Sequence, residues 1–178
     1  MTRRAGLGSP LALLAAMCLA GGAVPAAQSG DQEPLAIIVN RANPVDNLSL
    51  DELRRAFLGG QQHWPNGRKI TVVMRPPGDV GRDIMLRGVC RMTEPEFQKY
   101  VLQATFTGET TGGPRVLDTS LGVRRFVFNV PGAIGYVRLS EVDDTVKVIR
   151  IDGRAPSEVG YPLTVPPRSV GAVSELRN

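Results

Sequence analysis

The chain has 178 residues, of which 42% are hydrophobic and 21% are charged, and its formal net charge at pH 7 is +4. This composition excludes a disordered, collagen-like or disulfide-scaffold chain, and the length predicts one domain with at most a short appendage. One His and two Cys argue against a tetrahedral zinc site and a His-dependent triad, although these counts alone exclude neither, and we expect no metal and no cofactor.

The first 27 residues have the features of a secretory signal peptide. Two arginines form a positive start, residues 11–20 form an unbroken apolar run, and small residues follow. The run is shorter than the roughly 20 residues that span a bilayer core, which disfavours the alternative of an uncleaved anchor. Met17 is bulkier than the residue that generally precedes a lipidated cysteine, so we expect no lipid on Cys18. The sequence therefore predicts a periplasmic or secreted protein.

Removal of this segment takes away two arginines and no acidic residue, which lowers the excess of basic over acidic side chains from four to two. The remaining arginines are spread along the chain without interleaved aromatic residues, whereas nucleic-acid binding needs a concentrated basic face. We therefore expect no nucleic-acid partner. Cys90 is then the only thiol, and we expect it to be a small buried residue.

Four short apolar runs rich in β-branched residues have the length of strands. They cover residues 35–40, 69–74, 133–137 and 146–151. A polar lead-in over 28–34 precedes the first of them. The Pro-rich stretch after Gly153 contains a candidate edge strand at 161–165, and residues 166–178 are expected to form a flexible tail.

Capping motifs mark the starts of the predicted helices. Ser49-Leu-Asp-Glu52 is a capping box, and Gly59-Gly60 ends the helix behind it. A second capping box, Thr93-Glu-Pro-Glu96, opens a helix through about Gln103. Asp118-Thr119-Ser120 can cap a further helix.

One more helix is expected over residues 82–91. We expect its core-facing residues to be Ile84, Met85, Gly88 and Val89. The Gly/Thr-rich connection over 107–114 is the segment expected to be most mobile. Strands that alternate with helices indicate a layered α/β domain, which we place at residues 35–165.

The loop between the second strand and the next helix, Arg75-Pro-Pro-Gly78-Asp79-Val80-Gly81, is the strongest candidate for chemistry. Ligands of open α/β sheets bind beyond the carboxyl ends of the strands. A Gly-containing loop that enters a helix offers free amides to an oxyanion, and an arginine can add two parallel hydrogen bonds. The alternative is that these residues serve turn geometry alone. The candidate anion-binding residues are Arg75, Gly78, Asp79, Val80, Gly81 and Arg82.

Six segments, including Pro-Gly-Ala-Ile-Gly-Tyr at 131–136, form a set with a characteristic order. They lie at residues 37–40, 49–59, 64–67, 70–75, 131–137 and 160–163. In this order they resemble the phosphate-binding periplasmic proteins of phosphate ABC importers, over about residues 35–165. The resemblance implies a single three-layer lobe of a type 2 periplasmic binding protein. It also implies phosphate or a similar oxyanion as ligand, and an ABC transporter or another envelope protein as partner.

The chain departs from the pattern of that family in two ways. The family has two lobes that close on phosphate, and this chain resembles one of them. The family loop reads Arg, two residues, Gly and then Ser-Gly-Thr, where this chain has Asp79, Val80 and Gly81 in the last three places. Both hydroxyls are absent, and Asp79 as a helix cap would occupy amides that an anion needs. We therefore expect weak phosphate affinity.

Two functions stay open on this basis. The first is an exported solute-binding module for phosphate or a similar oxyanion. The second is a periplasmic interaction or sensory domain that keeps the fold with a degenerate anion site, for example as a homodimer that rebuilds a two-walled cleft. We do not expect an enzyme, because no Ser, Cys or Lys comes with an identifiable base. Ser120 is interpreted as a helix cap near the same cleft, and Tyr136 as a core residue.

Overall fold

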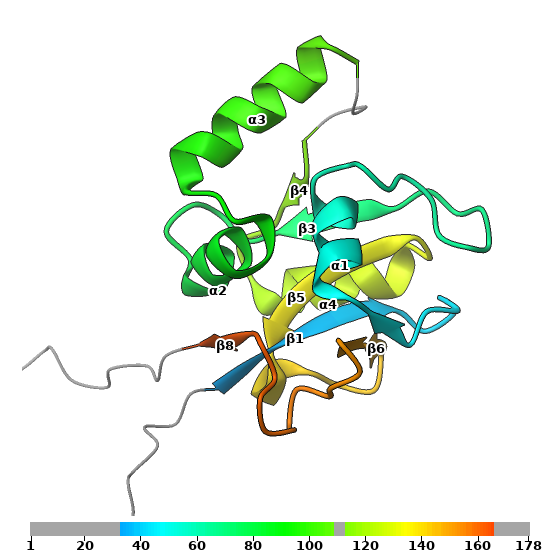
Figure 1. Ribbon diagram of the computed structural model, residues 1–178. Coiled ribbons are helices and arrows are strands. Elements are labelled where there is room, and N and C mark those ends of the chain that lie inside the picture. Colours follow the sequence, from blue (N-terminus) through cyan, green and yellow to red (C-terminus); the bar gives the residue numbers. More distant parts are fainter. Residues whose placement is uncertain (1–32, 109–112, 166–178) are drawn as a thin grey trace, which may run out of the picture.

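A computed structural model describes residues 33–108 and 113–165 of the chain (Figure 1). The predicted signal peptide, most of the polar lead-in, the predicted C-terminal tail and the centre of the Gly/Thr-rich connection lie outside the described residues. No helix within the described ranges is long and apolar enough to cross a membrane.

The strands within the described residues are β1 (Glu33–Asn40), β2 (Asn47–Leu48), β3 (Thr71–Met74), β4 (Arg115–Val116), β5 (Ala133–Arg138), β6 (Val146–Val148), β7 (Arg150–Ile151) and β8 (Thr164–Val165). Six of them form one mixed sheet with the order β4-β3-β5-β1-β6, in which β8 pairs with the start of β1. β3 runs parallel to β4 and β5, whereas β1 runs antiparallel to β5, β6 and β8. A separate parallel pair joins β2 and β7.

The α-helices of the described residues are α1 (Leu50–Phe57), α2 (Val80–Ile84), α3 (Glu94–Phe106) and α4 (Ser120–Asn129). A π-helical turn, Met85–Cys90, follows α2 directly, and a 3-10 turn, Leu139–Glu141, follows β5. In Figure 1, α1 and α2 lie over one face of the sheet, α4 lies on the other, and α3 projects away from the body of the domain.

Alternation of side chains along β1 builds the two halves of the core. Ile37 belongs to a buried cluster that includes Leu53 of α1 and Met85 of the π-helical turn. The next residue, Ile38, belongs to a second cluster that includes Val123 of α4. Successive side chains of a strand point to opposite faces, so each face of β1 supports its own helical layer. The predicted layered α/β class is confirmed.

The two predicted capping boxes are confirmed at atomic detail. The Ser49 hydroxyl accepts from the Glu52 amide, and the Glu52 carboxylate accepts from the Ser49 amide at 2.8 Å. Thr93 and Glu96 form the second capping box. α3 ends at Phe106 rather than near Gln103.

The helix predicted over 82–91 differs from the observed one in its start and in its buried face. It starts at Val80, because Asp79 caps it, and from Met85 it continues as a π-helical turn. Gly88, which we expected to face the core, is exposed, whereas Leu86 is buried. The reason is that a π-helical turn has a wider hydrogen-bond spacing than the α-helical period assumed in the prediction.

Two further differences concern short strands. The strand predicted over 146–151 is interrupted at Ile149, whose amide donates to the Ile37 carbonyl, so its first part pairs with β1 and its last part with β2. β2 and β4 have two residues each and were not predicted, since two residues carry no periodic pattern. Cys90 is fully buried as predicted, and burial raises the pKa of its thiol to about 12.

Candidate anion-binding site

A small cavity lies beside the carboxyl end of β3, where the chain leaves the sheet for α2. Its volume is about 190 Å³. It is lined by Leu35, Arg75, Asp79, Val80, Gly81, Ser120, Tyr136, Val137, Arg138 and Glu141. The structure thus brings four of the six predicted site residues to one cavity and leaves Gly78 and Arg82 outside its lining.

A tight turn shapes the loop between β3 and α2. The Asp79 amide donates to the Pro76 carbonyl at 3.2 Å, and Gly78, the third residue of the turn, has a φ of +88°. A positive φ at this position of a turn favours glycine because side chains rarely adopt it. Gly78 therefore sets the direction in which Asp79 and the start of α2 face the cavity.

Asp79 connects the loop to the helix through both of its carboxylate oxygens. Oδ1 accepts from the Arg82 amide at 3.2 Å, which is the helix-capping bond that the sequence predicted. Oδ2 accepts from Arg75 Nε at 3.2 Å. The cap uses the Arg82 amide, so the amides of Val80 and Gly81, at the first two helical positions, keep no acceptor within the helix.

The Arg75 guanidinium is partly engaged. Nε donates to Asp79, and Nη1 donates to the Leu117 carbonyl at 3.3 Å. No described residue accepts from Nη2. The Arg75 amide donates to the Tyr136 hydroxyl at 2.9 Å, which links the end of β3 to β5. Arg75 is thus held in place while one of its nitrogens stays available.

Arg82 is bonded to the loop through the Arg75 carbonyl and does not line the cavity. Only 4% of its surface is exposed. Nε and Nη2 donate to the two oxygens of Glu94 at 2.7 and 2.8 Å, and Nη1 donates to the Arg75 carbonyl at 2.8 Å. Its guanidinium also lies 5.4 Å from the centre of the Phe97 ring. The observed place of Arg82 is therefore structural, between the loop and the first turn of α3.

Several lining residues were not among the predicted site residues. Thr119, rather than Ser120, caps α4, and the Ser120 hydroxyl donates to Glu141 at 2.7 Å. Tyr136 is buried in the core as predicted, but it is also one of the residues that line the cavity. Arg138 and Glu141 come from the end of β5 and the turn behind it. The Pro-Gly-Ala-Ile-Gly-Tyr segment drew attention to Tyr136 in the sequence, whereas no sequence motif indicated Arg138 or Glu141.

The charged side chains that line the cavity balance in sign. Two arginines, Arg75 and Arg138, face two carboxylates, Asp79 and Glu141. Arg138 is also paired with Glu33 at 3.1 Å. A cavity lined by one sign of charge concentrates the opposite ion, and this lining provides little such attraction. Asp79, which stands where the family loop has Ser, therefore contributes a negative charge that offsets the arginine charge of the lining.

Gly81 stands where the family loop has Thr, and the structure leaves little room for a side chain there. An added Cβ would lie 3.1 Å from an Asp79 oxygen, 3.2 Å from Leu35 and 3.3 Å from Tyr136. We expect Gly81→Thr to destabilise the domain by about 1–3 kcal/mol through overpacking, without improved anion binding. Urea unfolding with Gly88→Thr as the control would test this, because only a Leu163 atom at 3.5 Å meets a Cβ at Gly88. Equal destabilisation of the two variants would contradict it.

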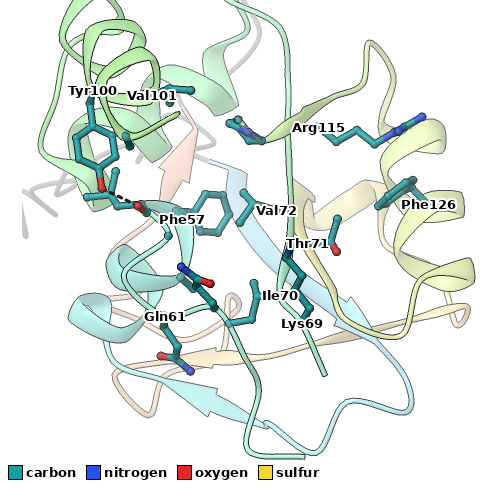
Figure 2. Close-up of a pocket in the computed structure, with 17 residues that line it drawn as sticks. Phe57, Gln61, Lys69, Ile70, Thr71, Val72, Tyr100, Val101, Arg115 and Phe126 are labelled. Atoms are coloured by element: carbon teal, nitrogen blue, oxygen red, sulfur yellow. Dashed lines mark hydrogen bonds between the residues drawn. The ribbon is translucent and has the colours of Figure 1, made fainter. Parts of the chain in front are cut away.

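A larger cavity of about 450 Å³ lies between the end of α1, β3 and α3 (Figure 2). Phe57, Ile70 and Val72 form apolar parts of its lining. Arg115 stacks over Phe126 at 5.1 Å, and the Tyr100 hydroxyl donates to the Leu58 carbonyl at 2.6 Å. None of the predicted site residues lines it. Within the described residues, no group of three or more His, Cys, Asp or Glu side chains could hold a metal ion.

The phosphate-binding protein PstS of Bacillus subtilis is 32% identical over 127 residues, which cover 68% of this chain and 37% of that protein. The chain is a relative of this phosphate-binding protein. No protein-family model matches it.

Solved structures of such proteins have the same fold. An ABC-type phosphate transport receptor from Vibrio cholerae superposes with a TM-score of 0.62 at 23% identity, over 75% of this chain and 54% of that one. PstS from Borrelia burgdorferi superposes with a TM-score of 0.60 at 14% identity, over 75% of this chain and 55% of that one. The predicted fold and the predicted relationship to phosphate-binding proteins are confirmed. The chain spans about half the length of these solved relatives and just over a third of the Bacillus protein.

Proposed function

We propose that this domain binds phosphate or a similar oxyanion, weakly, in the 190 Å³ cavity at the end of β3. The observation that carries the proposal is that the Arg75 guanidinium and the start of α2 converge on one cavity. Free amides at a helix start and an arginine nitrogen are suited to the oxygens of a small anion. The kinship with phosphate-binding proteins supports the same ligand class.

The weakness follows from Asp79. Its carboxylate lines the cavity and accepts from Arg75, so it competes with a ligand for the same guanidinium. The two hydroxyls of the family loop are absent as well. We further propose that residues 35–165 form one binding lobe of an exported, periplasmic protein that is not an enzyme. Its partner would be an ABC transporter or another envelope protein.

Removal of the Arg75 side chain tests the ligand site. We expect Arg75→Ala to weaken phosphate binding by about 10- to 100-fold, since a hydrogen bond to a charged group contributes roughly 1.5–3 kcal/mol. Titration calorimetry with millimolar phosphate, sulfate and molybdate measures this. Arg87→Ala is the matched control, because it removes the same charge from an exposed position outside the cavity lining. No heat with any of the three anions for the unaltered protein would overturn the proposal.

The surface around the cavity favours a second candidate, an interaction or sensory domain with a degenerate anion site. Val80, which lines the cavity, is 43% exposed, and Leu121, next in sequence to the lining residue Ser120, is 47% exposed, as is Val116 at the end of β4. Exposed apolar side chains are a feature of surfaces that meet a partner when they form a patch. Light scattering that shows a dimer, together with no anion heat, would favour this candidate over the first.

A further inference from the structure

Tyr136 lines the anion cavity, and its hydroxyl bonds the amide of Arg75, another residue of the same lining. Tyr136 lies in β5, its ring packs at 6.3 Å from the ring of Phe57, and 1% of its surface is exposed. It is nevertheless one of the cavity-lining residues. A buried tyrosine usually has a hydrogen-bond partner for its hydroxyl.

The proton of the Tyr136 hydroxyl has no acceptor among the described residues. The Tyr136 oxygen accepts from the Arg75 amide at 2.9 Å. A phenolic hydroxyl also donates one hydrogen bond, and no described residue accepts it. Burial raises the pKa of this hydroxyl, so it keeps its proton at neutral pH.

The other two tyrosines show the contrast. The Tyr161 hydroxyl donates to the Leu35 carbonyl at 3.0 Å, and the Tyr100 hydroxyl donates to the Leu58 carbonyl at 2.6 Å. Neither of them lines this cavity. Of the tyrosines, all of which lie within the described residues, Tyr136 alone has a donor without an acceptor in the described structure.

We propose that the Tyr136 hydroxyl donates a hydrogen bond to an oxyanion held by Arg75 and so replaces one of the hydroxyls that the family loop has and this chain lacks. The inference rests on the proposed function and adds a ligand-binding residue to it. The hydroxyl that holds the Arg75 amide would then also hold the ligand. Hydrogen bonds in such a chain polarise one another, so the Arg75 bond strengthens the donor that the anion meets.

Removal of the hydroxyl is the first arm of the test. We expect Tyr136→Phe to weaken phosphate binding about tenfold or more, which is the usual effect of a lost hydrogen bond to a charged group. Tyr161→Phe is the matched control and keeps the affinity of the unaltered protein, because Tyr161 is also buried but lies outside the cavity lining, and its hydroxyl bonds the Leu35 carbonyl. Unchanged affinity of Tyr136→Phe would overturn the inference.

Tyr136→Phe also leaves the Arg75 amide without its acceptor, so a second arm separates the two roles. Incorporation of 3-fluorotyrosine at position 136 makes the hydroxyl a stronger donor and a weaker acceptor. If the hydroxyl donates to the anion, phosphate affinity at pH 6 rises; if it only accepts from Arg75, affinity falls or stays the same, which overturns the inference. The same replacement at Tyr161 controls for the added fluorine.

The outcomes for the tyrosine and for the proposed function are distinct. Binding that depends on Arg75 but is not tightened by fluorination leaves the proposed function in place and removes Tyr136 from the ligand set. If the unaltered protein gives no heat, the fluorotyrosine comparison is made in the Asp79→Ser background. No heat from the unaltered protein overturns the proposed function, and absence of phosphate binding in the Asp79→Ser background as well also overturns the inference on Tyr136.

Discussion

Replacement of Asp79 with serine is expected to tighten phosphate binding by about a thousandfold. Two like unit charges about 4 Å apart repel by about 4 kcal/mol at an effective dielectric near 20, and every 1.4 kcal/mol corresponds to a factor of about ten in affinity. The Asp79 carboxylate lines the cavity and accepts from Arg75 Nε. Its removal ends the repulsion and frees a second arginine nitrogen for the ligand. Serine also restores one hydroxyl of the family loop.

The fold should tolerate this change. Asp79 caps α2 through the Arg82 amide, and serine is about as good a helix cap as aspartate. Asp79→Asn separates the two contributions, because it removes the charge and keeps the cap without a hydroxyl donor. Asp83→Asn is the control for net charge, since Asp83 is exposed and does not line the cavity. Titration calorimetry and urea unfolding of the four proteins measure the effect. Affinities that stay equal across the series would show that Asp79 does not limit binding.

Loss of the Glu94 charge is expected to have the largest effect on stability. Both oxygens of Glu94 accept from the Arg82 guanidinium, and the Arg82 side chain is 5% exposed. Removal of one partner of a buried ion pair leaves an uncompensated charge and usually costs about 3–5 kcal/mol. We therefore expect Glu94→Gln to lower the free energy of unfolding by an amount near this range. Urea unfolding at pH 7 measures it, with Asp83→Asn as a control at an exposed site.

The effect of Glu94 should depend on pH in a defined direction. Hydrogen bonds from Arg82 hold the pKa of the Glu94 carboxyl below its usual value. A carboxyl whose pKa is lower in the folded state stabilises the fold above its unfolded pKa of about 4.3 and loses this contribution as the pH falls through the folded value. The difference between the unaltered protein and Glu94→Gln should therefore be constant at neutral pH and shrink below about pH 4. A difference that stays the same into acid would contradict this.

The turn and the helix cap of the loop between β3 and α2 were predictable because their parts are neighbours in the sequence. Arg75 and the start of the next helix are separated by one tight turn, and Gly78 and Asp79 are residues with a defined role in turns and caps. The capping boxes at Ser49 and Thr93 were found for the same reason. A motif whose hydrogen bonds join residues within four positions of one another can be predicted without information on the rest of the chain.

The rest of the cavity was not predictable because its parts come from distant segments. Tyr136 is 61 residues from Arg75 in the sequence. The apolar pattern of its strand predicts that Tyr136 is a core residue, but it does not predict what its hydroxyl bonds. The pairing of Arg82 with Glu94 depends on how α3 leaves the π-helical turn. The sequence by itself determined the layered α/β class, the starts of α1, α3 and α4 and the loop that enters α2, because periodicity and capping are local properties. Only the tertiary structure decided which charges and hydroxyls meet Arg75, because the pairing of β3 with β5 and the packing of α4 bring them there.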